Sequence, residues 1–200
     1  MLLKKIESKD KVIWVTEPNA KPEILIQVKD AWLIGAVNRL VELGDYEGIK
    51  KAAKESGEVM FDKLIPRKEK PEKWTPMRWV ELTTEYIHNP AGAGITFSEI
   101  SDSGVTAHYF KCSRPELSST NPHAACYFHY GIWRAIWQKA FPNGDLIIKG
   151  IMSFGCPTCD FKFVVNATDS NRKKMGSYIA KITKKYKSKT TPTNFWNTED

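Results

Sequence analysis

Cysteine and histidine side chains gather in three short segments of this chain, and they are the groups with the most reactive chemistry. The segments are residues 108–112 (HYFKC), 123–129 (HAACYFH) and 156–159 (CPTC). Thiolate and imidazole groups can attack a substrate, transfer protons, form a redox pair or hold a metal ion. Because three separate segments bring sulfur, we weigh these roles against simple packing of buried cysteines.

Cys126 has the best local arrangement for an activated thiol, since a histidine lies three residues away on each side. A nucleophilic cysteine needs a base nearby. Helical spacing puts His123, Cys126 and His129 on a common but drifting face, so Cys126 can share a wall with either histidine, though not equally well with both. We predict Cys126 and Cys112 as catalytic cysteines, with His123 or His129 as the acid/base.

Two residues near Cys112 are predicted to bind a substrate. Cys112 is expected where a strand ends, and the guanidinium of Arg114, two residues further on, can hold a carboxylate through two hydrogen bonds. His108 lies on the same expected strand, where a histidine is more often a satisfied polar residue than a ligand.

The C-x-x-C pair formed by Cys156 and Cys159 raises the possibility of a metal site. A structural zinc site uses four cysteine or histidine ligands, often as two closely spaced pairs. Cys112, Cys126, Cys156 and Cys159 are therefore an alternative set of ligands for zinc or an iron-sulfur centre. A redox pair is disfavoured, because such pairs sit at the start of a helix and this one precedes a strand. Period two points Cys159 toward the core, or toward a site shared with Cys112 and Cys126.

The N-terminal part of the chain has helical periodicity. Apolar residues repeat on one face from Glu23 to Leu43, Gly44 is a stop, and Asp45 can cap a second helix over residues 46–64. The pattern predicts a helical hairpin. Residues 65–76 form a charged, proline-bearing linker or an ordered surface loop.

The remaining chain alternates between helical and strand periodicity, which predicts an α+β fold with a four-stranded, mostly antiparallel sheet and helices on one face. We predict that residues 1–75 form an N-terminal helical segment packed on the main domain, and that residues 76–200 form the α+β domain with the cysteines and histidines. The alternative is one single domain. The expected elements are a helix at 77–88 ended by Asn89-Pro90 with His88 as its cap, strands at 95–100 and 105–112, a helix at 121–141, strands at 145–155 and 158–167, and a last helix from Ser170 or Asn171.

Composition limits the partners. The net charge of +7 invites a nucleic-acid partner, but much of the excess lies in residues 171–189, whose pattern is that of the solvated side of an amphipathic helix. No zinc-finger spacing, aromatic RNA-binding motif or helix-turn-helix pattern accompanies the charge, so nucleic acid is not expected. No apolar run approaches the roughly 18 residues of a membrane span. We predict a cytoplasmic protein with a small-molecule substrate, and a homo-oligomer stays possible.

The run HYFKC…HAACYFHYG…GDLIIKGIMSFGCPTCDFKF, within roughly residues 25–165, resembles the L-2-amino-thiazoline-4-carboxylic acid hydrolase-like family. The resemblance matches the family's cysteine after a strand to Cys112, its cysteine at the start of a helix to Cys126, and its G-x-x-x-C-D-F-x-F strand to residues 155–163. It implies hydrolytic opening of a cyclic amidine or thiazoline acid at a C–N bond that is not a peptide bond, by a thiolate with a histidine acid/base or by metal-activated water. The alternative is a metal-binding or ligand-sensing module without turnover.

Overall fold

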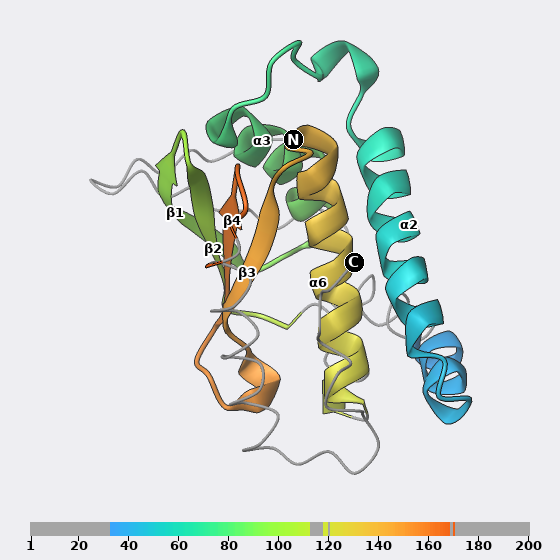
Figure 1. The fold of residues 1–200 in the computed structure, drawn as a ribbon. Helices are drawn as coiled ribbons and strands as arrows, with labels where there is room; N and C mark the ends of the chain where they lie inside the picture. The colour runs from blue at the N-terminus through green and yellow to red at the C-terminus, as the bar shows by residue number, and fades with distance from the viewer. Residues whose placement is uncertain (1–32, 113–117, 120, 169, 171–200) are drawn as a thin grey trace.

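The computed structural model describes residues 33–112, 118–119, 121–168 and 170. It confirms the predicted α+β class, with helices packed on one face of a four-stranded antiparallel sheet (Figure 1). The predicted last helix lies outside the described residues. None of the helices in the described part of the chain is long and apolar enough to cross a lipid bilayer.

The turn between the two N-terminal helices lies where the sequence predicts, whereas the predicted start of the first helix at Glu23 lies outside the described residues. Residues 33–42 are helical, and Gly44 follows with a left-handed φ of 68°. Asp45 then caps α2 (Tyr46–Leu64), because its side chain accepts a hydrogen bond of 2.8 Å from the backbone N–H of Gly48. Glycine and the N-cap carboxylate thus define the turn between the two helices.

Replacing Asp45 with alanine is expected to lower the free energy of unfolding by about 1 kcal/mol, since a donor at the helix start loses its acceptor. Urea denaturation followed by circular dichroism would measure this loss. Glu55→Ala is the matched control, because this exposed carboxylate on α2 makes only a 4.0 Å ion pair with Lys51. A loss of the same size for both variants would contradict the capping role.

Helix α2 lies alongside α6 (Pro122–Ala140), and small residues let the two helices approach closely (Figure 1). A Cβ atom on Gly57 would lie 2.4 Å from the backbone oxygen of Ile132 and 2.7 Å from the Cβ of Ala135. A Cβ on Gly131 would lie 2.7 Å from the Cβ of Ala53. The backbone of each glycine therefore packs directly against the facing helix.

Gly57→Ala is expected to destabilise the protein by about 1–2 kcal/mol, although alanine is the better helix former, because the new methyl group meets backbone rather than a movable side chain. Gly35→Ala is the matched control. Gly35 is also helical, but its added Cβ would meet nothing within 4 Å, so this change is expected to stabilise by up to about 1 kcal/mol. Thermal unfolding of the two variants should therefore shift in opposite directions.

The segment after α2 corrects one prediction. A short 3-10 turn (Arg67–Glu69) leads to α3 (Pro76–Thr83), but Asn89-Pro90 does not end this helix. The chain widens into a π-helical turn (Thr84–His88) and continues into α4 (Asn89–Ala91), which Gly92 ends with a φ of 63°.

The π turn explains why Pro90 is tolerated. The backbone N–H of Asn89 bonds to the oxygen of Thr84, five residues back, so the helix widens just before the proline. His88 is consequently not an exposed cap but a core residue with 1% of its surface accessible. The sequence prediction for His88 was wrong for this reason.

The sheet consists of β1 (Ile95–Ser101), β2 (Gly104–Tyr109), β3 (Asp145–Gly150) and β4 (Cys159–Val164), in the order β1-β2-β4-β3 with every pair antiparallel. Its inner face packs against the helices around Trp79, whose ring contacts those of Phe97, Trp133, Trp137 and Phe163. Trp133 and Trp137 lie four residues apart on one face of α6, and both are buried.

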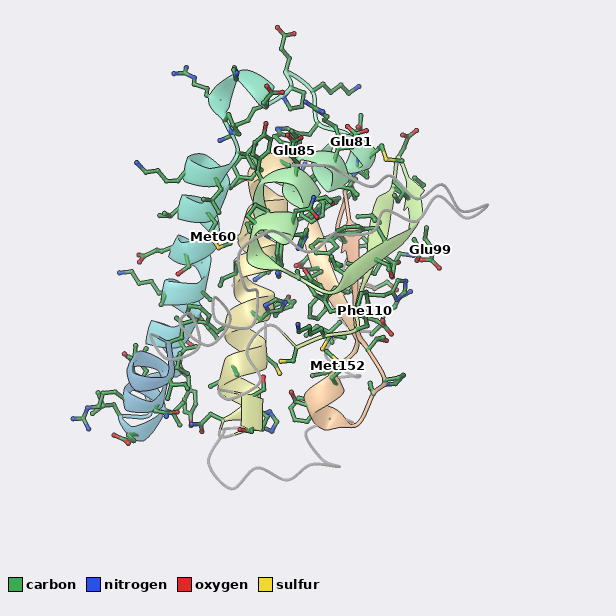
Figure 2. The ribbon with its side chains drawn as sticks, turned by 180° about the vertical axis from the view of Figure 1, so that it is seen from behind. Met60, Glu81, Glu85, Glu99, Phe110 and Met152 are labelled. Atoms are coloured by element: carbon green, nitrogen blue, oxygen red, sulfur yellow. The ribbon has the colours of Figure 1, made fainter. Side chains whose placement is uncertain are left out.

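Strand β1 contains a bulge directly after Ser98. The register with β2 shifts between Ser98 and Ser101, and Glu99 has a left-handed φ of 51°. Strict alternation would turn Glu99 to the core face that Phe97 occupies. The bulge instead puts its carboxylate on the outer face, where it accepts a hydrogen bond of 2.7 Å from Thr106 and lies 3.6 Å from the Lys162 ammonium (Figure 2). The strained backbone thus avoids a buried charge.

Candidate functional site

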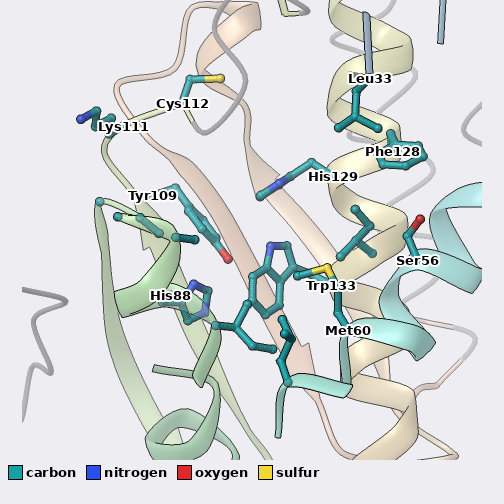
Figure 3. Close-up of a pocket in the computed structure, with 17 residues that line it drawn as sticks. Leu33, Ser56, Met60, His88, Tyr109, Lys111, Cys112, Phe128, His129 and Trp133 are labelled. Carbon is teal, nitrogen blue, oxygen red and sulfur yellow. The ribbon is translucent and has the colours of Figure 1, made fainter. Parts of the chain in front are cut away.

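Two adjoining cavities lie between α6 and the end of β2. The larger has a volume of about 480 Å³ and is also lined by α2 and by the turn that follows the π-helical segment (Figure 3). The smaller has a volume of about 30 Å³ and reaches toward the 3-10 turn Met152–Phe154 and the start of β4. Four residues line both cavities: Tyr109, Lys111, Cys112 and His129.

Three of the four cysteines line the small cavity: Cys112, Cys126 and Cys159. Antiparallel pairing places Tyr109 opposite Cys159, which brings the end of β2 beside the start of β4. Each sulfur has a polar neighbour. The sulfur of Cys112 lies 3.4 Å from the Ser118 hydroxyl, that of Cys126 lies 3.4 Å from the Ser153 hydroxyl, and that of Cys159 accepts from the Met152 backbone N–H at 3.3 Å.

The histidines around Cys126 are not equivalent. His129 lines both cavities, whereas His123 is buried with its ring 4.8 Å from that of Phe154 and lines neither cavity. Burial lowers the pKa of His123. Residues spaced by three rotate gradually around a helix, so of the two histidines only His129 lines the small cavity together with Cys126.

Burial also makes two of the cavity thiols less acidic than an ordinary cysteine. It raises the pKa of Cys126 to about 12 and that of Cys159 to about 11. The weaker causes differ: the Ser153 hydrogen bond lowers the pKa of Cys126, and the Met152 N–H lowers that of Cys159. Both groups are thus neutral thiols near pH 7, and a neutral thiol is a poor nucleophile.

The alternative metal set is not assembled. Cys156 lies outside the lining of the cavity that the other three cysteines share. Within residues 33–112, 118–119, 121–168 and 170, no three histidine, cysteine, aspartate or glutamate side chains gather as metal ligands do. The arrangement of Cys112, Cys126, Cys156 and Cys159 therefore does not fit a tetrahedral zinc or iron-sulfur centre.

His108 lies away from both cavities, because neighbouring strand residues point to opposite faces and Tyr109 takes the inner one. On the outer face, His108 Nδ1 lies 2.8 Å from Asp160 Oδ1, and Nε2 lies 2.7 Å from the Ser98 hydroxyl. The Thr158 hydroxyl also donates to Asp160 Oδ1 at 2.8 Å. His108 thus belongs to a hydrogen-bonded row across three strands, and Arg114 lies outside the described residues.

The structure adds four cavity residues to which the sequence analysis gave no role in a site: His88, Tyr109, Lys111 and Trp133. The sequence could have indicated Lys111, because it directly precedes Cys112, a predicted site residue. His88 had no such signal, because its place depends on a π turn that the Asn-Pro pair conceals.

Comparison with known proteins adds no relative, since neither a protein-family model nor a curated protein matches the chain. The resemblance to thiazoline hydrolases rests on the quoted residues alone. Function must therefore be argued from the two cavities.

Proposed function

We propose that this protein is a hydrolase that acts on a non-peptide C–N bond of a cyclic amidine or thiazoline-type carboxylic acid, with Cys112 as nucleophile and His129 as acid/base. One observation carries the proposal: Cys112 and His129 line both cavities, and Cys112 is the one cysteine among the described residues that lines the larger. A substrate in the larger cavity would meet this thiol and this imidazole together.

The chemistry balances with these two groups and one water. The thiol proton of Cys112 passes to His129, and the sulfur adds to the amidine carbon of the imino tautomer. The ring C–N bond then breaks with its electron pair on nitrogen, which takes the proton from His129. In the second half, water gives a proton to His129, its oxygen bonds to the same carbon, and the Cys112 sulfur leaves and takes the proton back.

The surrounding groups have supporting roles in this proposal. Burial raises the pKa of Cys126 and of Cys159, and in this proposal these two thiols shape the cavity wall while Cys112 reacts. Lys111 beside Cys112 supplies a positive charge for a substrate carboxylate, a role that the sequence assigned to Arg114. A catalytic free thiol stays reduced in a reducing compartment, so the proposal includes a cytoplasmic location for the protein.

The test is to incubate the full chain with 2-amino-thiazoline-4-carboxylic acid and a small series of cyclic amidine acids, and to follow each by mass spectrometry. Turnover should give a product heavier by one water, and iodoacetamide should block it while modifying Cys112. Binding of these acids without any product would instead favour the ligand-sensing module. Absence of both binding and product would reject this substrate class.

A second candidate function follows from the outer face of the sheet. Ser98, His108 and Asp160 have the nitrogen assignments and separations of a serine hydrolase triad, which is recognised by geometry rather than by sequence order. Labelling by a fluorophosphonate probe that is lost in Ser98→Ala, but kept in the nearby Ser101→Ala, would support ester hydrolysis there. Equal labelling of both variants would reject it.

A further inference from the structure

The larger cavity offers more apolar room than a small ring acid needs. Its lining comes mainly from hydrophobic side chains on α2, the π turn and α6, among them Met60, Ile87, Phe128 and Ile132 (Figure 3). Its volume of about 480 Å³ lies within the range of roughly 300–1,000 Å³ that is typical of ligand sites. A thiazoline or amidine head at Cys112 would leave most of this space unfilled.

His88 introduces one polar atom into this apolar lining. Its ring stacks on Trp133, with centroids 4.3 Å apart and planes at 18°, and meets Phe97 and Tyr109 edge-on. The side chain is 1% exposed, and its Nε2 has no hydrogen-bond partner among the described residues. Buried polar atoms without partners are uncommon in folded proteins, and this one belongs to a residue of the cavity lining.

The charge state of His88 limits which kinds of ligand atom the imidazole can bind. Burial lowers the pKa of His88 to about 3, so the imidazole is neutral near pH 7. A neutral imidazole forms a hydrogen bond with an uncharged hydroxyl, amide or carbonyl and offers no charge for a carboxylate. Lys111 lines the cavity beside Cys112, away from His88, and its side chain is exposed (Figure 3).

We propose that the large cavity receives the apolar, aromatic body of an amphipathic carboxylic acid, with its acid end near Lys111 and Cys112 and an uncharged polar atom of its far end bound by His88. This inference rests on the proposed function for the reactive end of the substrate and assigns the substrate class: an aryl-substituted acid rather than a small polar one.

Binding is measured by calorimetry with the phenylalkanoates from phenylacetate to 6-phenylhexanoate, on the full chain carrying Cys112→Ser. The Kd is expected to fall about fourfold for each added methylene until the cavity is filled, with a negative heat-capacity change. Acetate and hexanoate should bind far more weakly. Equal affinity along the series would overturn the proposal.

A matched pair of variants locates the binding. Met60→Trp fills the cavity from α2 and is expected to weaken binding of 4-phenylbutanoate at least tenfold. Val59→Trp adds the same ring at the neighbouring position, which is 57% exposed and outside the lining, and should leave the Kd unchanged. The same Kd for both variants would overturn the assignment.

His88→Phe tests the polar contact and keeps an aromatic ring on Trp133. Wild-type protein should prefer 4-(4-hydroxyphenyl)butanoate over 4-phenylbutanoate by about tenfold, and the variant should lose this preference. A preference that the variant retains would overturn the role of His88. These binding results stand apart from turnover: binding without hydrolysis rejects the proposed reaction alone, whereas hydrolysis of small acids without phenylalkanoate binding rejects this inference alone.

Discussion

Replacing Cys112 with serine is expected to lower the turnover number of the proposed hydrolysis by about 10³-fold or more, the scale seen when a nucleophile is removed. The hydroxyl of serine is a far weaker nucleophile than a thiolate at neutral pH, and none of the other cavity thiols can replace it. Burial holds the pKa of Cys126 near 12 and that of Cys159 near 11. Initial rates at saturating substrate would measure the effect.

Cys126→Ser is the matched control for this prediction, since it makes the same atomic change in the same small cavity. It is expected to reduce turnover by less than about tenfold, because its neutral thiol contributes packing rather than attack. Circular dichroism would establish that both variants fold. If Cys126→Ser lost activity as completely as Cys112→Ser, the nucleophile would be the residue favoured by the sequence pattern instead.

Stability is expected to fall by about 2 kcal/mol between pH 7 and pH 5 through His88 alone. The pKa of this group is about 3 in the folded protein and 6.5 in the unfolded chain. The unfolded state therefore binds the extra proton as the pH falls below 6.5, and the folded state does not. Stability is retained above pH 6.5 and lost progressively down to about pH 3.

Urea denaturation of wild-type protein and His88→Phe at pH 7 and pH 5 would isolate this contribution. The variant keeps the aromatic stack on Trp133 but has no group to titrate. Other groups, including His123 with its lowered pKa, act in both proteins and cancel in the difference. The same pH dependence in both would contradict a neutral, buried His88.

Local signals in the sequence predicted most of the fold. Helix α2 and the turn before it follow from Gly44 and Asp45, which act through backbone conformation and a single hydrogen bond. The order of strands along the chain follows from period two, although β2, β3 and β4 are shorter than predicted and β1 is one residue longer. Strand β3 ends at Gly150, because the chain turns into the 3-10 segment Met152–Phe154.

The candidate site was less predictable, because it depends on contacts between distant segments. The sequence could place Cys112, Cys126 and Cys159 on three segments, but only tertiary packing brings them to one small cavity. The choice of His129 over His123 depends in the same way on where α6 meets the turn at Phe154. The pairing of His108 with Asp160 required the register of β2 and β4, which no local pattern specifies.

The bulge in β1 also affects how the protein behaves in crowded solution. Among the residues that the structure describes, β1 lies at one edge of the sheet, and an edge strand offers backbone groups to which another chain can add as a further strand. The left-handed turn at Glu99 interrupts this edge after Ser98, so only the stretch from Ile95 to Ser98 keeps regular pairing geometry. A strand from another molecule could therefore pair only with this short stretch, which ends at the charged side chain of Glu99. The same residue that avoids a buried charge thus protects the sheet against aggregation through this edge.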